Sequence, residues 1–293
     1  MPDVSNIRSA ISPSAVMQVG HIEGKKFQPP SPIAMFDSGV GGLTVLTEVI
    51  RVLPHEDIVY LADNKRVPYG NKTNDEIIKI NQKLIGFFVE KGAKLVVMAC
   101  GTSSSIAYPV VKKQFKVPII GIIEPGARAA AAATRSQKIG VIATEGTTRS
   151  GAYPTAIKNI LGIGADIRVI ACPLFVPLVE GGFLDGPETK AVAEGYLAPL
   201  KENNIDTLVL GCTHYPHLKK IIADVMGLGV KLIDPAEETA KEVKVTLEKL
   251  KLLKESPQPA HYTFLTSNSP GRFQESATKL FKRQIMGVSK VDV

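Results

Sequence analysis

The chain has 293 residues, enough for one large domain or two of ordinary size. Hydrophobic residues make up 44% and charged residues 22%, a balance that fits a folded globular protein and excludes a disordered chain. No apolar run reaches the roughly 20 residues that a membrane-spanning helix needs. The first thirty residues also lack the apolar core of a signal peptide. We therefore expect a cytoplasmic protein that makes no use of a membrane, with a flexible N-terminal tail at 1–30.

The net charge of +7 permits nucleic-acid binding, but the basic residues are spread along the chain without an aromatic-rich basic stripe. A solvated basic surface is the favoured interpretation. The chain has three cysteines, an odd number that argues against a disulfide framework. They lack the C-x-x-C spacing of a metal site. We expect Cys172 to be a buried, unreactive thiol.

Short β-branched apolar runs alternate with helical stretches along the chain. The first strand is expected at 33–37 (IAMFD), before a glycine-rich turn and a helix that stops at Pro54. The second is expected at 58–62 (IVYLA), and a capping box of Thr73 and Glu76 begins the helix after it. Further strands are expected at KLVVMA (94–99), PIIGI (118–122), KIGVIA (138–143), DIRVIA (166–171) and DTLVLG (206–211).

This alternation predicts an α/β fold with mainly parallel sheets. A strand followed by DSGVGG resembles a strand followed by TEGTTRSG, and a strand followed by CGT resembles a strand followed by CTH. We interpret the echo as two similar α/β domains with the active site in the cleft between them. The first would comprise 31–125 plus 235–293, completed by C-terminal helices, and the second 126–234.

Ligands of parallel sheets bind beyond the carboxyl ends of the strands. Asp37, Cys100, Thr144 and Cys212 all follow predicted strands, so one site would gather them. Cys100 and Cys212 occupy matching contexts where a helix N-terminus favours a thiolate. Two thiols that flank one carbon atom would supply a base on one face and an acid on the other. A Cys–His thiol hydrolase would leave one of the two cysteines unexplained.

Several neighbouring residues allow two interpretations. Asp37 begins a motif, DSGVGG, that is neither a dinucleotide fingerprint nor a P-loop, and it is either a helix cap or a catalytic acid. The segment PYG at 68–70 is either a surface loop or a wall of the cleft. His214 is either a structural hydrogen-bonding residue or the proton partner of Cys212. Glu180 is either a surface carboxylate or a second acid on the Cys212 side.

Seven segments together resemble the glutamate racemases of the cofactor-independent aspartate/glutamate racemase superfamily, over roughly 33–273. They are FDSGVGGLTV, YLADNKRVPYG, ACGTSSS, IIGIIEPGARAA, GVIATEGTTRSGAY, CPLFVPLVEGG and LGCTHYPHL. The resemblance implies an isomerase that interconverts L- and D-glutamate and supplies D-glutamate for peptidoglycan, and hence for cell wall biogenesis and cell shape. It also implies no pyridoxal phosphate and no metal, a homodimer, and in some members contact with DNA gyrase.

The resemblance further implies roles for individual residues. Cys100 and Cys212 match the two catalytic cysteines, with Asp37 assisting Cys100, and with His214 and Glu180 assisting Cys212. The implied substrate-contacting residues are Asp37, Ser38, Pro68, Tyr69, Gly70, Gly101, Thr102, Thr213 and His214. Two rival hypotheses are aspartate as the substrate and a binding protein that keeps this fold without catalysis.

One position departs from the resembled family, which usually has asparagine where this chain has Gly101. The loss of one hydrogen bond to the substrate would cost about 0.5–1.5 kcal/mol. We expect Ser103, Ser104 or a water molecule to replace it; otherwise affinity falls or the preferred substrate changes.

Overall fold

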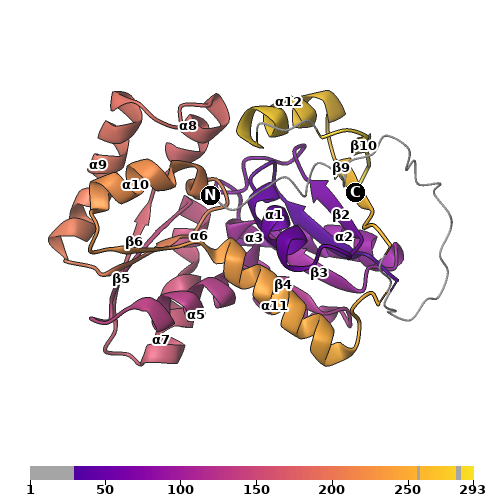
Figure 1. Cartoon of the computed structure of the whole chain (residues 1–293), viewed down its shortest axis with the longest axis horizontal. Coiled ribbons are helices and arrows are strands. Elements are labelled where there is room, and N and C mark those ends of the chain that lie inside the picture. Colours follow the sequence, from indigo (N-terminus) through magenta and orange to yellow (C-terminus); the bar gives the residue numbers. More distant parts are fainter. Residues whose placement is uncertain (1–29, 256–257, 282–284) are drawn as a thin grey trace.

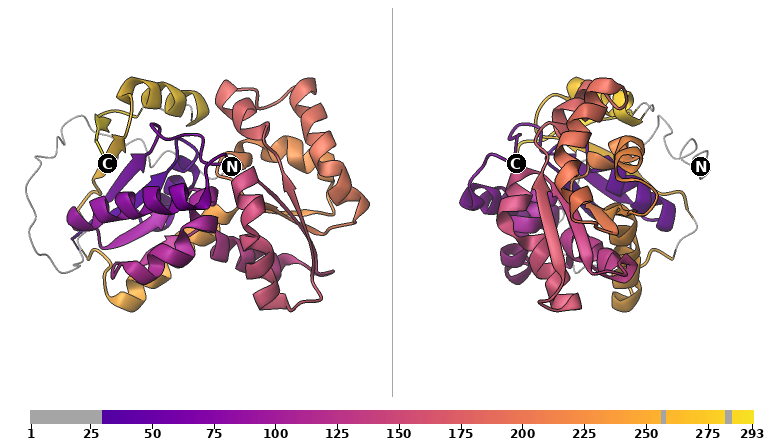
Figure 2. Two further views of the ribbon diagram at one scale, coloured as in Figure 1. Left: turned by 180° about the vertical axis from the view of Figure 1, so that it is seen from behind. Right: turned by 90° about the vertical axis from the view of Figure 1, so that its left-hand side faces the viewer.

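The computed structural model describes residues 30–255, 258–281 and 285–293, so nearly all of the expected tail at 1–30 lies outside the described residues. The chain forms two lobes side by side, each a parallel β-sheet with helices packed on it (Figure 1). The same two lobes are distinct in the view from behind (Figure 2). The predicted α/β class with two parallel sheets is confirmed.

The sheet of the first lobe has the strand order β10-β9-β2-β1-β3-β4, and its neighbouring strands are parallel. Its central strand β1 is buried along its whole length. Before the final Asp37 it is an unbroken apolar run, which is typical of a strand covered on both faces. The strands are β1 (Ile33–Asp37), β2 (Ile58–Ala62), β3 (Leu95–Met98), β4 (Ile119–Gly121), β9 (Tyr262–Thr266) and β10 (Ser289–Lys290).

The sheet of the second lobe has the order β6-β5-β7-β8, again parallel throughout. Its strands are β5 (Lys138–Ala143), β6 (Asp166–Ala171), β7 (Thr207–Leu210) and β8 (Lys231–Ile233). The chain enters this lobe through the helix between β4 and β5, and it leaves after β8 at Asp234. The domain boundaries at 125/126 and 234/235 stay a prediction, although the changes of sheet fall at these two places.

The helices follow the strands as the alternating pattern predicted, and the Thr73–Glu76 capping box is present. The helices are α1 (Leu43–Val52), α2 (Asn74–Glu90), α3 (Gly101–Ile106), α4 (Tyr108–Gln114), α5 (Ile123–Ala133), α6 (Glu145–Ser150), α7 (Ala152–Leu161), α8 (Phe175–Gly181), α9 (Pro187–Glu202), the 3₁₀ helix η2 (Tyr215–Leu218), α10 (Lys219–Met226), α11 (Pro235–Leu250) and α12 (Pro270–Phe281). Within the described residues, none of these helices is long and apolar enough to cross a membrane.

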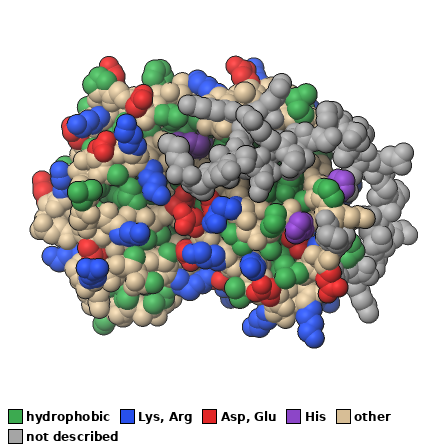
Figure 3. Space-filling view, viewed as in Figure 1, with side chains coloured by type: hydrophobic (Ala, Val, Ile, Leu, Met, Phe, Trp, Pro, Cys, Tyr) green, Lys and Arg blue, Asp and Glu red, His purple; other side chains and the backbone are tan. Residues whose placement is uncertain are grey.

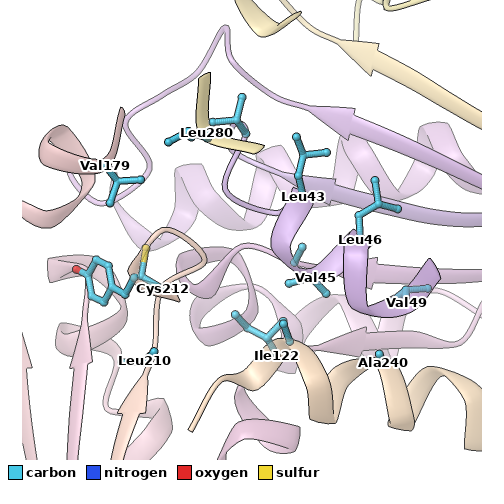
Figure 4. Close-up of a cluster of buried hydrophobic side chains, with 14 of the residues drawn as sticks. Leu43, Val45, Leu46, Val49, Ile122, Val179, Leu210, Cys212, Ala240 and Leu280 are labelled. Carbon is cyan, nitrogen blue, oxygen red and sulfur yellow. The ribbon is translucent and has the colours of Figure 1, made fainter. Parts of the chain in front are cut away.

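One hydrophobic cluster contains buried residues of both lobes. It joins the buried face of α1 and the inner face of α11 to the end of β7. Figure 4 shows Ile122 between Val45 of α1 on one side and Leu210 and Cys212 on the other. Cys212 is therefore anchored at the edge of a core that belongs to both halves of the molecule.

Three strands were not predicted from the sequence. β8 has three residues with only Ile233 buried, and β9 alternates between partly exposed and buried residues. β10 has two exposed residues at the edge of the sheet. The C-terminal segment was expected to add helices to the first lobe, but it adds β9 and β10 as well as α12. Such short, partly exposed runs carry little hydrophobic periodicity, so they are hard to predict.

The charged surface agrees with the expectation of a solvated protein. On the face shown in Figure 3, Lys and Arg side chains are scattered among Asp and Glu side chains.

One ion pair is buried in the first lobe. The Lys94 ammonium lies 2.5 Å from the Glu56 carboxylate, and both side chains are at most 3% exposed. Glu56 also accepts a hydrogen bond from the Lys254 amide. The pair therefore ties the start of β3 to the loop before β2.

We predict that Lys94→Met destabilises the protein by about 3–5 kcal/mol, because it leaves the Glu56 carboxylate buried without its cation. Urea unfolding followed by circular dichroism measures this loss. The control is Lys190→Met, which removes a cation from an exposed pair with Glu194 and should cost no more than about 0.5 kcal/mol. Equal effects of the two substitutions would contradict a structural role for the buried pair.

Candidate active site

Cys100 lies between β3 and α3, at the N-cap position of α3. Its side chain is 6% exposed, and its thiol lies 3.9 Å from the Ser38 hydroxyl. Burial, together with the charges of Asp37 and Cys212, raises the pKa of Cys100 to about 12. Cys100 is therefore a protonated thiol at neutral pH, able to donate a proton.

Cys212 lies in the other lobe, two residues after β7 ends and three residues before η2 begins. Its sulfur lies 3.8 Å from His214 Nδ1, and His214 Nε2 lies 3.1 Å from a Glu180 carboxylate oxygen. Burial alone would lower the pKa of His214, but the hydrogen bonds to Cys212 and Glu180 and the nearby negative charges raise it to about 10. An imidazolium thus stands between a thiol and a carboxylate.

Asp37 links the turn after β1 to the turn that carries Cys212. It ends β1, is 1% exposed, and accepts hydrogen bonds from the Gly39 amide at 2.8 Å and from the Thr213 hydroxyl at 3.4 Å. Burial raises the pKa of Asp37, while the charge of His214 and these hydrogen bonds oppose the rise. Asp37 was expected to assist Cys100; the structure places its carboxylate against the Cys212 turn as well, where it accepts the hydrogen bond from Thr213.

A chain of hydroxyl groups crosses the cleft beside Cys100. Thr102 of the first lobe lies 2.9 Å from the Thr144 hydroxyl of the second, which in turn lies 3.1 Å from the Thr147 hydroxyl. Thr147 is 2% exposed and was not among the predicted site residues. Its signal in the sequence is the TEGTT motif, in which a threonine caps the helix after β5 and a second one follows three residues later.

The PYG segment lies at the rim of the cleft. Tyr69 is buried, and its hydroxyl donates a 2.5 Å hydrogen bond to Asp63, so this hydroxyl is directed into the first lobe. Pro68 is exposed, and the peptide bond before it is cis. The Gly70 carbonyl faces Gly146 of the second lobe. The segment therefore forms a wall that meets the opposite half, with its backbone toward the cleft.

The expected replacements for the missing asparagine behave differently from each other. The Ser104 hydroxyl donates to the Met98 carbonyl at 2.7 Å and accepts from the Ile122 amide at 3.2 Å. Ser104 thus ties β3 to the residue before α5, and its replacement of the asparagine as a substrate contact stays a prediction. The Ser103 hydroxyl is buried and lacks a hydrogen-bond partner among the described residues.

The cleft is closed in this structure. Asp37, Cys100, Thr102, Cys212, Thr213 and His214 are each at most 7% exposed. A hollow of about 490 Å³ lies at the rim, lined by 71–75 of the first lobe and by Arg149, which donates a hydrogen bond to the Lys72 carbonyl. A cavity of only about 10 Å³ adjoins Cys212 from the side of α1 and α11. The two thiols are therefore almost fully enclosed in this structure.

The geometry defines a class of site. Two turns from two similar α/β lobes bring together a protonated thiol, a second thiol beside an imidazolium, and a buried carboxylate, all within electrostatic reach of one another. Such a group can remove a proton from one face of a small molecule and return one to the other. An enzyme that inverts a stereocentre needs acid and base groups of this kind.

Comparison with known proteins agrees with that class. The family model for Asp/Glu/Hydantoin racemases matches residues 43–243. A glutamate racemase of Geobacter metallireducens is 46% identical over 247 residues, which cover 84% of this chain and 90% of that protein. The structure of a glutamate racemase isoform from Bacillus anthracis matches with a TM-score of 0.86 and 37% identity, covering 91% of this chain and 99% of the other. A Francisella tularensis glutamate racemase in complex with D-glutamate matches with a TM-score of 0.84 and 34% identity, covering 90% and 98%.

The chain therefore belongs to the Asp/Glu/Hydantoin racemase family, and it is a racemase, an enzyme of the isomerase class.

We predict that Glu180→Gln lowers the pKa of His214 from about 10, because the variant removes the carboxylate that faces Nε2. Titration of the His214 ring by NMR measures the change. Because this pKa is raised on folding, its contribution to stability is complete below the ordinary value of 6.5 and is lost as the pH rises through about 10. Glu180→Gln should therefore reduce stability near neutral pH.

Glu188→Gln, an exposed change on α9, is the control and should leave the titration of His214 as it is. An unchanged His214 titration in Glu180→Gln would contradict the role assigned to this pair.

Proposed function

We propose that this racemase interconverts L- and D-glutamate. The observation that carries the proposal is the pairing of Cys100 and Cys212 on matching turns of the two lobes, one with a protonated thiol and one beside the His214 imidazolium. The names of the relatives support glutamate as the substrate, since the relatives reported above are glutamate racemases and one of them was crystallised with D-glutamate.

In the proposed mechanism the two thiols act on opposite faces of the substrate Cα. With L-glutamate, the Cys212 thiolate takes the Cα proton, so that the C–H bond breaks and an S–H bond forms. Cys100 then gives its thiol proton to the other face and becomes the thiolate. With D-glutamate, Cys100 acts as the base and Cys212 as the acid. The resting state described here, with Cys100 protonated, is the one that would process L-glutamate.

The difficult step is removal of a weakly acidic proton, and it needs stabilisation of the negative charge that develops on the substrate. Oriented donors in a closed, water-poor site do this better than water does. The backbone amides at the turns after β1, β3 and β7, the cross-cleft threonines and the His214 imidazolium are the donors that this site offers. The proposed reaction uses no pyridoxal phosphate and no metal.

The supporting residues divide by position. Asp37 and His214 adjust the charge around the thiols, and Glu180 acts through His214 as a positioning residue. Closure of the lobes places the substrate against residues of both halves. The proposed substrate contacts are Asp37, Ser38, Pro68, Tyr69, Gly70, Gly101, Thr102, Thr213 and His214.

The cellular role follows from the proposed reaction. D-Glutamate made in the cytoplasm would feed peptidoglycan synthesis, and through it cell wall biogenesis and cell shape. A homodimer and a contact with DNA gyrase stay predictions that the interior of a single chain does not test.

We predict that Cys100→Ser and Cys212→Ser each lower the rate of racemisation by about 10²–10⁴-fold, the usual contribution of one acid–base group. Circular dichroism of glutamate solutions follows the rate. Cys172→Ala is the matched control and should retain activity, since Cys172 is also buried but its thiol donates to the Ile170 carbonyl of its own strand. Full racemisation by Cys212→Ser would end the two-thiol mechanism.

The choice of substrate has its own test. The purified protein, with a chelator and without added cofactor, should racemise L- and D-glutamate and incorporate deuterium from heavy water at Cα. Parallel assays with L- and D-aspartate should give much lower rates. Faster turnover of aspartate would favour the first rival, and an absence of exchange with all four amino acids under reducing conditions would favour the non-catalytic binder.

A further inference from the structure

Glu180, which faces the His214 ring, is poorly supported by its own helix. It is the last residue but one of α8, a helix of seven residues, and helices this short are marginal without packing. Its side chain is 53% exposed, so burial does not hold the carboxylate in place. The free carbonyls at the end of a helix also carry partial negative charge, which disfavours a carboxylate there. The end of α8 therefore needs support from outside the helix.

That support comes from α12, a helix of the first lobe that contacts α8 (Figure 1). The Lys279 ammonium of α12 donates a 2.6 Å hydrogen bond to the carbonyl oxygen of Gly181, the residue directly after Glu180. The lysine side chain lies across the next residue, since a Cβ at Gly182 would lie 2.6 Å from Lys279 Cε. A cation that binds the last carbonyls of a helix stabilises its C-terminus. Lys279 thus caps α8 from the opposite lobe.

The apolar face of α12 holds this helix in place. Phe273, Ala277 and Leu280 recur at helical spacing and are buried. Leu280 and Val179 of α8 belong to the same buried cluster (Figure 4). This packing brings Lys279 to the end of α8, although the lysine itself is exposed and is not part of the core.

A second contact joins α12 to the segment that follows His214. The ring of Phe281 packs edge-on against the ring of His217 in η2, with 5.1 Å between the ring centres. Burial and the charge of His214 lower the pKa of His217 to about 4, so the His217 ring is neutral at pH 7. His217 lies three residues after His214. The helix α12 therefore contacts the chain on both sides of the Glu180–His214 pair, at α8 and at η2.

We propose that Lys279 is a positioning residue, which holds the end of α8 so that the Glu180 carboxylate faces the His214 ring. The inference rests on the proposed two-thiol reaction, in which Glu180 acts through His214 on Cys212. Lys279 would act on the reaction only through Glu180. The Cys212 half of the site would thereby depend on a helix of the first lobe.

The test is a double-mutant cycle in the full chain, with Lys279→Met, Glu180→Gln and the two combined. Lys279→Met should lower kcat about two- to ten-fold, the net worth of one hydrogen bond, with KM nearly unchanged. In the Glu180→Gln background the same substitution should change kcat by less than about two-fold, because the carboxylate that it positions is already gone. The control is Arg272→Met, which removes an exposed cation from the first turn of α12 and should leave kcat unchanged.

Titration of the His214 ring by NMR gives a readout that does not depend on turnover. The charged and titratable groups that act on this ring are Cys212, Glu180, Asp37 and His217. Loss of the Glu180 contact should lower the pKa of His214 from about 10, whereas loss of a cation alone would raise it. The expected result is a fall in Lys279→Met and no change in Arg272→Met.

The outcomes separate this inference from the proposed function. An unchanged kcat in Lys279→Met, or an equal fold-loss in the wild-type and Glu180→Gln backgrounds, would overturn the inference and leave the function intact. An unchanged or raised pKa of His214 in Lys279→Met would overturn it as well. If the wild type does not racemise glutamate, the function fails, and the titration decides the inference alone. Because Lys279 is exposed, Lys279→Met should unfold within about 4 °C of the wild type, so that both readouts report on folded protein.

Discussion

The contact between the turn after β3 and the turn after β7 is the constraint on which the rest of the site depends. The backbone carbonyl oxygen of Gly211 approaches Gly101 closely, at 2.6 Å from where its Cβ would lie. Around this contact, Asp37 reaches Thr213, and Thr102 reaches Thr144, so that hydrogen bonds between the lobes surround the two thiols. Without this closure, each lobe would present one thiol to solvent and neither an acid nor a base on the opposite face.

Closure also determines the protonation states. Burial disfavours charge, so the pKa of Cys100 rises to about 12 and its proton is retained. In the other lobe, burial alone would lower the pKa of His214. The hydrogen bonds of its ring to the Cys212 sulfur and the Glu180 carboxylate outweigh that effect and raise the pKa to about 10. Two lobes with similar folds thus present thiols in different electrostatic surroundings. The proposed two-thiol reaction needs one proton donor and one proton acceptor, and the protonated Cys100 fits the part of the donor.

The strands that form the site were predictable from the sequence because they are continuous apolar runs that end in polar residues. β1 ending at Asp37, β3 leading to Cys100 and β7 leading to Cys212 are all of this type. Parallel strands place such ends at one edge, so the gathering of these residues followed from the pattern. β9 was missed because most of its residues are only partly buried, and β10 because it has two residues, both exposed.

Contacts between individual side chains were beyond sequence reasoning. The residue pattern alone left Glu180 with two interpretations, and only the resemblance implied that it assists Cys212, since its pairing with His214 depends on where α8 lies in space. Thr147 was overlooked because its partners are hydroxyls that the fold brings together. The Ser104 hydroxyl, by contrast, is taken up by the backbone of β3 and the start of α5.

The most direct test is a crystal structure of the full chain with glutamate bound between the lobes. The two-thiol account predicts the substrate Cα between the Cys100 and Cys212 sulfurs, approached from opposite sides at roughly the 3–3.5 Å of a reactive arrangement. A substrate whose Cα is within reach of one sulfur only, or that lies in a different cavity, would contradict it.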